Sequence, residues 1–278
     1  MTKSSGAENP IARLILALGT LVFAACLSAQ PGPSDEVALM AYRGSSVLDI
    51  SSGELLDGAT ILVRGERIEA VLAPDHPIPT EATVQNMSGH YAVPGLIDVH
   101  QHYAVGPPVE FALMMANRAI YGGVTSARDM TGDTRIIAYL ARQTLLGENG
   151  PPIYCSTDLA AHVAAQAHRA GVRFATGTDA WAPVDEEWPA LLHELELLRD
   201  RAGMAPIDVL RAATVNAAEA IGRESEEGRL EAGKLANITF FSTDPLALDA
   251  DFRTVVLTVK RGQQYWRENF VHVAPDTR

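Results

Sequence analysis

The spacing of apolar residues changes twice along the chain. In residues 37–93, short apolar runs alternate with turn residues, as in the run Ala59–Val63 before the Arg64-Gly65-Glu66 turn. After Pro94-Gly95, apolar runs alternate with segments whose apolar residues recur every three or four positions, as in βα units. Strand-like runs return after residue 236. The pattern predicts β structure at both ends of a central α/β segment.

The central segment contains four predicted strands and five predicted helices. The strands are Leu96–His102, Gly123–Ala127, Ile153–Ser156 and Val172–Thr176. The helices are Val109–Tyr121, Arg135–Leu146, Leu159–Ala170, Ala190–Arg201 and Pro206–Ile221. Two further strands, Asn237–Phe241 and Val255–Val259, are predicted near the C-terminal end.

Residues 1–29 have the pattern of a signal peptide. Lys3 and Arg13 precede an apolar run from Leu14 to Ala25, which is shorter than the about 20 residues that span a bilayer. We therefore expect an exported bacterial protein, periplasmic or secreted. The run that ends at Cys26 is similar to a lipoprotein box, so a lipidated membrane anchor is the alternative; no other membrane contact is expected.

Composition limits the chemistry. The chain has 278 residues, 47% of them hydrophobic, which is enough for a folded core. Its formal net charge of −12 argues against nucleic-acid binding, which depends on basic surfaces. Two cysteines without a Cys-x-x-Cys pair predict neither a disulfide framework nor a zinc ribbon. A metal ion would therefore need histidine and carboxylate ligands.

Two short motifs supply such ligands. His100 and His102 are two positions apart at the end of a predicted strand, so both project from one face, which Asp98 shares. Asp179 follows the strand Val172–Thr176. If each motif is considered alone, the histidines could simply contact solvent and Asp179 could cap a helix. Together, at the carboxyl ends of parallel strands, they predict a metal site.

Several segments together resemble the amidohydrolase superfamily of metal-dependent hydrolases, in its imidazolonepropionase-like branch. Besides the histidine motif and the Gly177-Thr178-Asp179 motif, the resemblance is carried by residues 57–68, 123–130, 192–195, 210–218 and 233–237.

The resemblance implies a (β/α)₈ barrel, residues 94–224, and a small composite β-sandwich from residues 36–93 and 225–270. It further implies that His100, His102 and Asp179 bind a divalent metal and that Asp179 activates the attacking water. Asp98 is expected to support an imidazole ligand.

The central segment is too short for a complete barrel. Leu96 to Gly222 is about 127 residues, whereas a full barrel takes about 250. We therefore expect an α/β fold with an incomplete TIM-like barrel that lacks its middle strands. No lysine lies between His102 and Asp179, so we expect one ion, zinc, rather than a lysine-bridged pair. His162 and His168 are expected at the surface or in packing contacts. His193 is the better pocket candidate, although a solvated position on its helix is favoured over the pocket.

The expected function is metal-dependent hydrolysis of a carbon–nitrogen bond in a small molecule: an amide, a cyclic amide or a dipeptide-like substrate. The alternative is a catalytically inactive relic or binding protein. Because half a barrel exposes strand edges, a homo-oligomer that completes the sheet is a further expectation.

Overall fold

The computed structural model describes residues 37–103, 109–130, 146–147, 164–179 and 186–272. Residues 38–278 form one compact unit. The predicted signal peptide with Cys26, the predicted strand Ile153–Ser156 and His162 lie outside the described residues. Within the described ranges, no helix is both long enough and apolar enough to cross a membrane.

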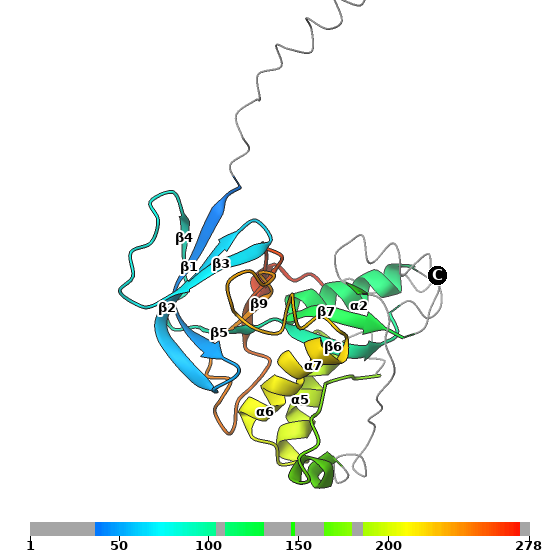
Figure 1. The fold of residues 1–278 in the computed structure, drawn as a ribbon. Helices are drawn as coiled ribbons and strands as arrows, with labels where there is room; N and C mark the ends of the chain where they lie inside the picture. Colours follow the sequence, from blue (N-terminus) through cyan, green and yellow to red (C-terminus); the bar gives the residue numbers. More distant parts are fainter. Residues whose placement is uncertain (1–36, 104–108, 131–145, 148–163, 180–185, 273–278) are drawn as a thin grey trace, which may run out of the picture. The chain divides into compact units, whose positions relative to one another are not determined.

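Both ends of the chain contribute to one eight-stranded sheet. Its order is β11-β10-β9-β5-β1-β2-β3, and β4 pairs with β1. The two halves join where β5 pairs antiparallel with β9 (Figure 1). The strands are β1 (Leu39–Asp49), β2 (Glu54–Arg64), β3 (Arg67–Leu72), β4 (Thr83–Asn86), β5 (Tyr91–Pro94), β9 (Ile238–Phe241), β10 (Val255–Lys260) and β11 (Gln263–Trp266).

This sheet has an apolar core that includes Tyr42, Ile61 and Phe240. The turn between β10 and β11 needs glycine, because Gly262 has a φ of +79° and an added Cβ would meet the carbonyl oxygen of Gly65. The sequence analysis did not predict β11, whose mixed Gln-Gln-Tyr-Trp composition lacks a clear apolar run.

A second, parallel sheet follows in the chain. Its order is β6 (Leu96–Gln101), β7 (Val124–Asp129) and β8 (Leu146–Gly147), and α2 (Val109–Tyr121) connects the first two strands. The segment 172–179 lies along the other edge of β6, because the Val99 amide donates to the Thr176 carbonyl at 2.9 Å and the Asp179 amide to the His100 carbonyl at 3.0 Å. Four extended segments are therefore neighbours.

The third strand of this sheet, β8, was not predicted. Leu146 and Gly147 pair with Ala127 and Arg128 of β7, at the point where the helix Arg135–Leu146 was predicted to end; residues 135–145 lie outside the described ranges. A short apolar run suits a buried strand as well as a helix, so periodicity alone could not separate them.

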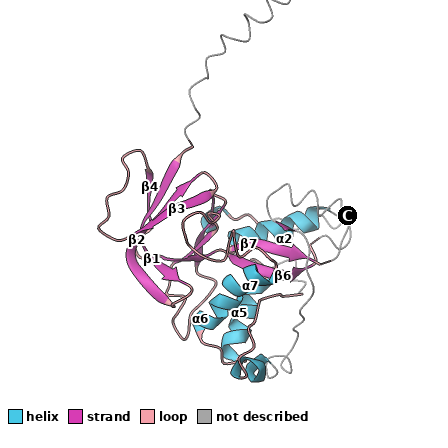
Figure 2. Cartoon of the chain, viewed as in Figure 1, coloured by secondary structure: helices cyan, strands magenta, loops and turns pink. Residues whose placement is uncertain are grey.

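The last predicted helix is two helices, α6 (Pro206–Ala212) and α7 (Val215–Ala220). The carbonyls of Ala212 and Ala213 accept hydrogen bonds from the amides of Thr176 and Ile97, at 3.0 and 2.8 Å. Because these carbonyls point to the strands, they are not available to continue the helix. Residues 164–169 are helical, as is α5 (Ala190–Asp200), and η1 (Arg267–Asn269) is a 3-10 turn (Figure 2).

Strand β6 separates an apolar face from a polar one. Ile97 and Val99 pack against Ala217 and Ala218 of α7. Because side chains alternate along a strand, Asp98 and His100 point to the opposite face. The fold is mixed α/β, and β6 presents its polar face beside the segment that carries Asp179.

Candidate metal centre

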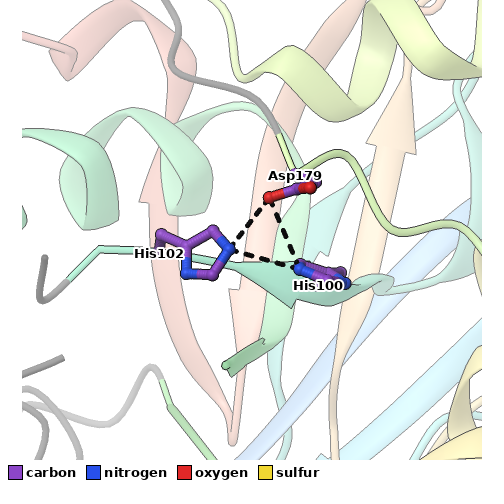
Figure 3. Close-up of side chains that lie close together, drawn as sticks. All are labelled: His100, His102 and Asp179. Atoms are coloured by element: carbon purple, nitrogen blue, oxygen red, sulfur yellow. Dashed lines mark hydrogen bonds and ion pairs between the residues drawn. The ribbon is translucent and has the colours of Figure 1, made fainter. Parts of the chain in front are cut away.

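The structure brings His100, His102 and Asp179 together (Figure 3). The Nε2 atoms of the two imidazoles are 3.2 Å apart. Asp179 Oδ1 lies 2.9 Å from His102 Nε2 and 3.4 Å from His100 Nε2. Three atoms that can donate an electron pair therefore converge on one point from two neighbouring segments.

The spacing of these atoms suits a zinc ion. Two ligands on a tetrahedral zinc, each about 2.0–2.2 Å from the ion, lie roughly 3.3 Å from each other. The observed separations of 2.9, 3.2 and 3.4 Å bracket that value. The donor set of two imidazoles and one carboxylate is also one that zinc uses in catalytic sites.

Exposure increases across the three ligands. The side chain of His100 is 3% exposed, that of His102 21%, and that of Asp179 32%. The site is therefore buried at β6 and open toward Asp179. Three protein ligands with an open side are typical of a catalytic zinc, in which water takes the fourth position.

Asp98 connects the two segments that carry the ligands. Its Oδ1 accepts hydrogen bonds from the amides of His100, at 3.2 Å, and Thr178, at 3.1 Å. Its Oδ2 accepts from the side chains of Gln101, at 2.6 Å, and Thr178, at 2.9 Å. Burial raises the pKa of Asp98 to about 6, although these hydrogen bonds favour the charged form.

Glu194, on α5, supports the same segment and was missed by the sequence analysis. Its Oε1 accepts a hydrogen bond from the Gly177 amide at 3.1 Å, and its Oε2 is buried with no hydrogen-bond partner among the described residues. Burial, and next the nearby charge of Asp98, raise the pKa of Glu194 to about 8. It thus resembles the perturbed carboxyl groups of functional sites.

The motif that contains Glu194 was recognised in the sequence, but its neighbour His193 was the residue considered for the pocket. In the Leu192-His193-Glu194-Leu195 motif, His193 was the pocket candidate, although a solvated position on the helix was favoured for it. The structure places His193 on the outer face of α5, with its side chain 64% exposed and 3.5 Å from Glu196. It is not part of the metal cluster. A buried position between apolar Leu192 and Leu195 is the helical signal that could have pointed to Glu194.

The other candidates lie elsewhere. His168 is partly exposed and lies 3.7 Å from Asp208. Lys234 donates to the Glu224 carbonyl at 2.5 Å. Lys260 is buried and donates to the carbonyl of Thr125, near the start of β7 and thus at the end of the strand opposite the histidines.

Lys260 belongs to a second buried polar cluster, centred on Glu227. The carboxylate of Glu227 accepts from Ser126 and Arg223, each at 2.6 Å, and from Asn237 at 2.8 Å. Burial lowers the pKa of Lys260 to about 8, and the charge of Glu227 opposes this shift. Cationic and anionic groups are thus paired here.

Parts of the chain are similar in sequence to known proteins. The sequence model of the amidohydrolase family matches residues 156–265, a range that includes Asp179 and Glu194. An adenine deaminase of Rubrobacter xylanophilus is 32% identical over 101 residues, which are 35% of this chain and 16% of that protein. An imidazolonepropionase of Symbiobacterium thermophilum is 44% identical over 64 residues, 22% of this chain and 15% of that protein.

The fold is also found among solved structures. An adenosine deaminase from Xanthomonas campestris with bound zinc superposes with a TM-score of 0.66 at 14% identity, covering 84% of this chain and 94% of that chain. The chain matches about one sixth of the length of the curated relatives. These matches confirm the predicted resemblance, and the structural likeness shows the fold.

Proposed function

We propose that this chain is a metal-dependent hydrolase of the amidohydrolase superfamily, whose sequence model matches residues 156–265, and that it cleaves a carbon–nitrogen bond in a small amide, cyclic amide or dipeptide-like substrate. The observation that carries the proposal is the convergence of His100 Nε2, His102 Nε2 and Asp179 Oδ1 within 4.8 Å. The names of the adenine deaminase and imidazolonepropionase relatives support hydrolytic chemistry of this class.

Each residue has a separate task in this proposal. His100, His102 and Asp179 would together hold one zinc ion. When bound, the ion lowers the pKa of a water molecule and polarises the scissile carbonyl or imine carbon. Asp179, the most exposed of the three, accepts the proton of the attacking water and returns it to the leaving nitrogen.

An incomplete (β/α) barrel is the architecture that we propose for residues 94–224, with a β-sandwich from residues 36–93 and 225–270. Its support is the order of the four neighbouring segments, 172–179, β6, β7 and β8. In a closed barrel the last strand lies beside the first, and the segment that carries Asp179 lies beside β6 in the same way.

A second candidate function is a catalytically inactive amidohydrolase that retains the metal site and binds a ligand or a second copy of the chain. The short central segment favours it, because only four extended segments are neighbours in the described part of the sheet. The same experiment separates the two candidates.

The test is the metal content of the purified chain, measured by elemental mass spectrometry, followed by hydrolysis of a panel of small amides. We expect about one zinc per chain, and its loss in Asp179→Asn and in the double variant His100→Ala/His102→Ala. The matched control is His193→Ala, which removes an exposed histidine and should retain the ion. A folded chain that binds no ion contradicts the proposal. Bound ion without hydrolysis favours the inactive candidate.

A further inference from the structure

The backbone before Asp179 is held in an unusual way. Three consecutive amides, those of Gly177, Thr178 and Asp179, each donate to a different acceptor. The acceptors are Glu194 Oε1 at 3.1 Å, Asp98 Oδ1 at 3.1 Å and the His100 carbonyl at 3.0 Å. In a regular strand, successive amides point to opposite sides and meet neighbouring strands. Here two of the three amides are bound by side-chain carboxyl groups, those of Glu194 on α5 and of Asp98 on β6.

The conformation of Asp179 requires such support. Its φ is +45°, in the left-handed region that residues other than glycine rarely occupy. An isolated residue in that region is less stable than in the extended one, so the surrounding contacts must select it. The turn that it makes directs the carboxylate back toward the imidazoles of His100, in β6, and His102, directly after β6 (Figure 3).

Gly177 lies between Glu194 of α5 and the ligand His100, and it contacts both. A Cβ added to Gly177 would lie 2.9 Å from His100 Cβ and 3.3 Å from the His100 amide nitrogen. The backbone at Gly177 is therefore packed directly against the ligand-bearing part of β6. On its other side, its amide is bound by Glu194. Glu194 and β6 together fix where the segment lies.

We propose that Glu194 is a positioning residue of the metal centre: by accepting the Gly177 amide, it holds residues 177–179 in the conformation in which Asp179 reaches His100 and His102. The inference rests on the proposed function, since it concerns the same site. The role requires a hydrogen-bond acceptor at the end of a side chain of this length. It does not require a negative charge, so glutamine should replace glutamate.

The test measures binding of cobalt(II), a spectroscopic substitute for zinc, to the full-length chain. Dissociation constants come from competition with a chelator, and the visible absorption of the bound cobalt reports its coordination geometry. The variants are Glu194→Gln, which keeps an acceptor oxygen, and Glu194→Ala and Glu194→Met, which remove it; methionine also fills the volume. The matched control is Glu196→Ala, on the same helix, whose carboxylate contacts Arg253 and His193 instead.

We expect Glu194→Ala and Glu194→Met to weaken cobalt binding about 10- to 100-fold, as is typical when a group that orients a ligand is removed, and to change the absorption spectrum. Glu194→Gln and Glu196→Ala should retain the wild-type affinity and spectrum. Rescue by glutamine excludes a purely electrostatic role, and loss of affinity in the volume-filling Glu194→Met variant excludes a purely space-filling one.

Several results would overturn the inference. One is a folded Glu194→Met variant with wild-type affinity and spectrum. Another is a Glu194→Gln variant that loses as much affinity as Glu194→Met, because the charge would then be what matters. If all three variants at this position fail to fold, Glu194 serves the fold as a whole and the inference is wrong. A wild-type chain that binds no cobalt instead removes the proposed function itself, so the two failures are distinguishable.

Discussion

The two ends of strands β6 and β7 carry buried polar clusters of opposite character. Near the start of β7, Glu227 binds Arg223, Ser126 and Asn237, and Lys260 lies close by. At the carboxyl ends, two imidazoles and the Asp179 carboxylate converge, with the carboxyl groups of Asp98 and Glu194 behind them. One cluster pairs cations with an anion, and the other gathers electron-pair donors.

The difference separates a structural cluster from a functional one. Buried charges persist when they are paired and hydrogen-bonded, and the Glu227 cluster meets both conditions with protein groups alone. At the carboxyl ends, in contrast, three atoms that can each donate an electron pair to an ion lie within 4.8 Å of one another. This end of the strands is therefore where we expect a metal ion.

The largest expected effect on stability is at the paired cluster. Replacing Glu227 by alanine leaves Arg223 and the buried Lys260 without their counter-charge, which should lower the free energy of unfolding by about 3 kcal/mol. Urea denaturation measures the change. Glu226→Ala is the matched control: its carboxylate also binds Arg223, but at the surface, so a loss below about 1 kcal/mol is expected. Equal losses in both variants would contradict the assignment of Glu227 as the centre of the cluster.

An intermediate effect is expected on the pH dependence of the unfolding free energy, through Glu194 beside the candidate metal centre. The pKa of Glu194 is raised from 4.5 to about 8, so the folded chain holds this proton more tightly than the unfolded chain. The resulting stabilisation is complete below about pH 4.5 and is lost as the pH rises through 8. In the presence of a chelator, the unfolding free energy of the wild type should fall between pH 5 and 8 by roughly 2 kcal/mol more than that of Glu194→Gln.

The control for this pH profile is Glu196→Gln, which should show the same fall as the wild type. Asp98 is the charged group that contributes to the shift at Glu194, and it is unchanged in both variants. Parallel profiles for the wild type and Glu194→Gln would show that Glu194 titrates as an ordinary carboxyl group.

The smallest expected effect comes from Lys260 in the Glu227 cluster. Here the unfolding free energy should rise with pH, whereas through Glu194 it should fall. The pKa of Lys260 is lowered from 10.5 to about 8, so the unfolded chain binds more protons above pH 8, and stability rises with pH in that range. Between pH 8 and 9.5, the wild type should gain about 1 kcal/mol relative to Lys260→Met. The groups whose charges act on Lys260 are Glu227, Arg261 and Arg223. Lys234→Met is the control, and a constant difference between the wild type and Lys260→Met would contradict the shift.

Local pattern was sufficient for part of the fold and of the site. The apolar spacing predicted the helix Val109–Tyr121 with the bounds that the structure shows. The two-residue spacing predicted that His100 and His102 share one side of a strand, because side chains alternate along a strand. In the structure His100 lies in β6 and His102 comes directly after its last residue, with the two Nε2 atoms 3.2 Å apart. Both features depend only on residues close in sequence.

Other features depended on distant contacts. The break between α6 and α7 arises because the carbonyls of Ala212 and Ala213 bind amides of Thr176 and Ile97, and the sequence around residue 213 shows only a continuous apolar spacing. The third strand at Leu146–Gly147 exists through its pairing with β7. No local signal distinguishes these alternatives.

The sequence by itself determined the chemistry that is available: two histidines on one strand face, an aspartate after a later strand, and a resemblance to metal-dependent hydrolases. Only the tertiary structure decided that the three ligand atoms lie 2.9–3.4 Å apart and that Glu194, rather than His193, faces the site. The physical reason is that composition and spacing fix which groups a segment can present, whereas burial and hydrogen bonding between distant segments fix which of those groups meet.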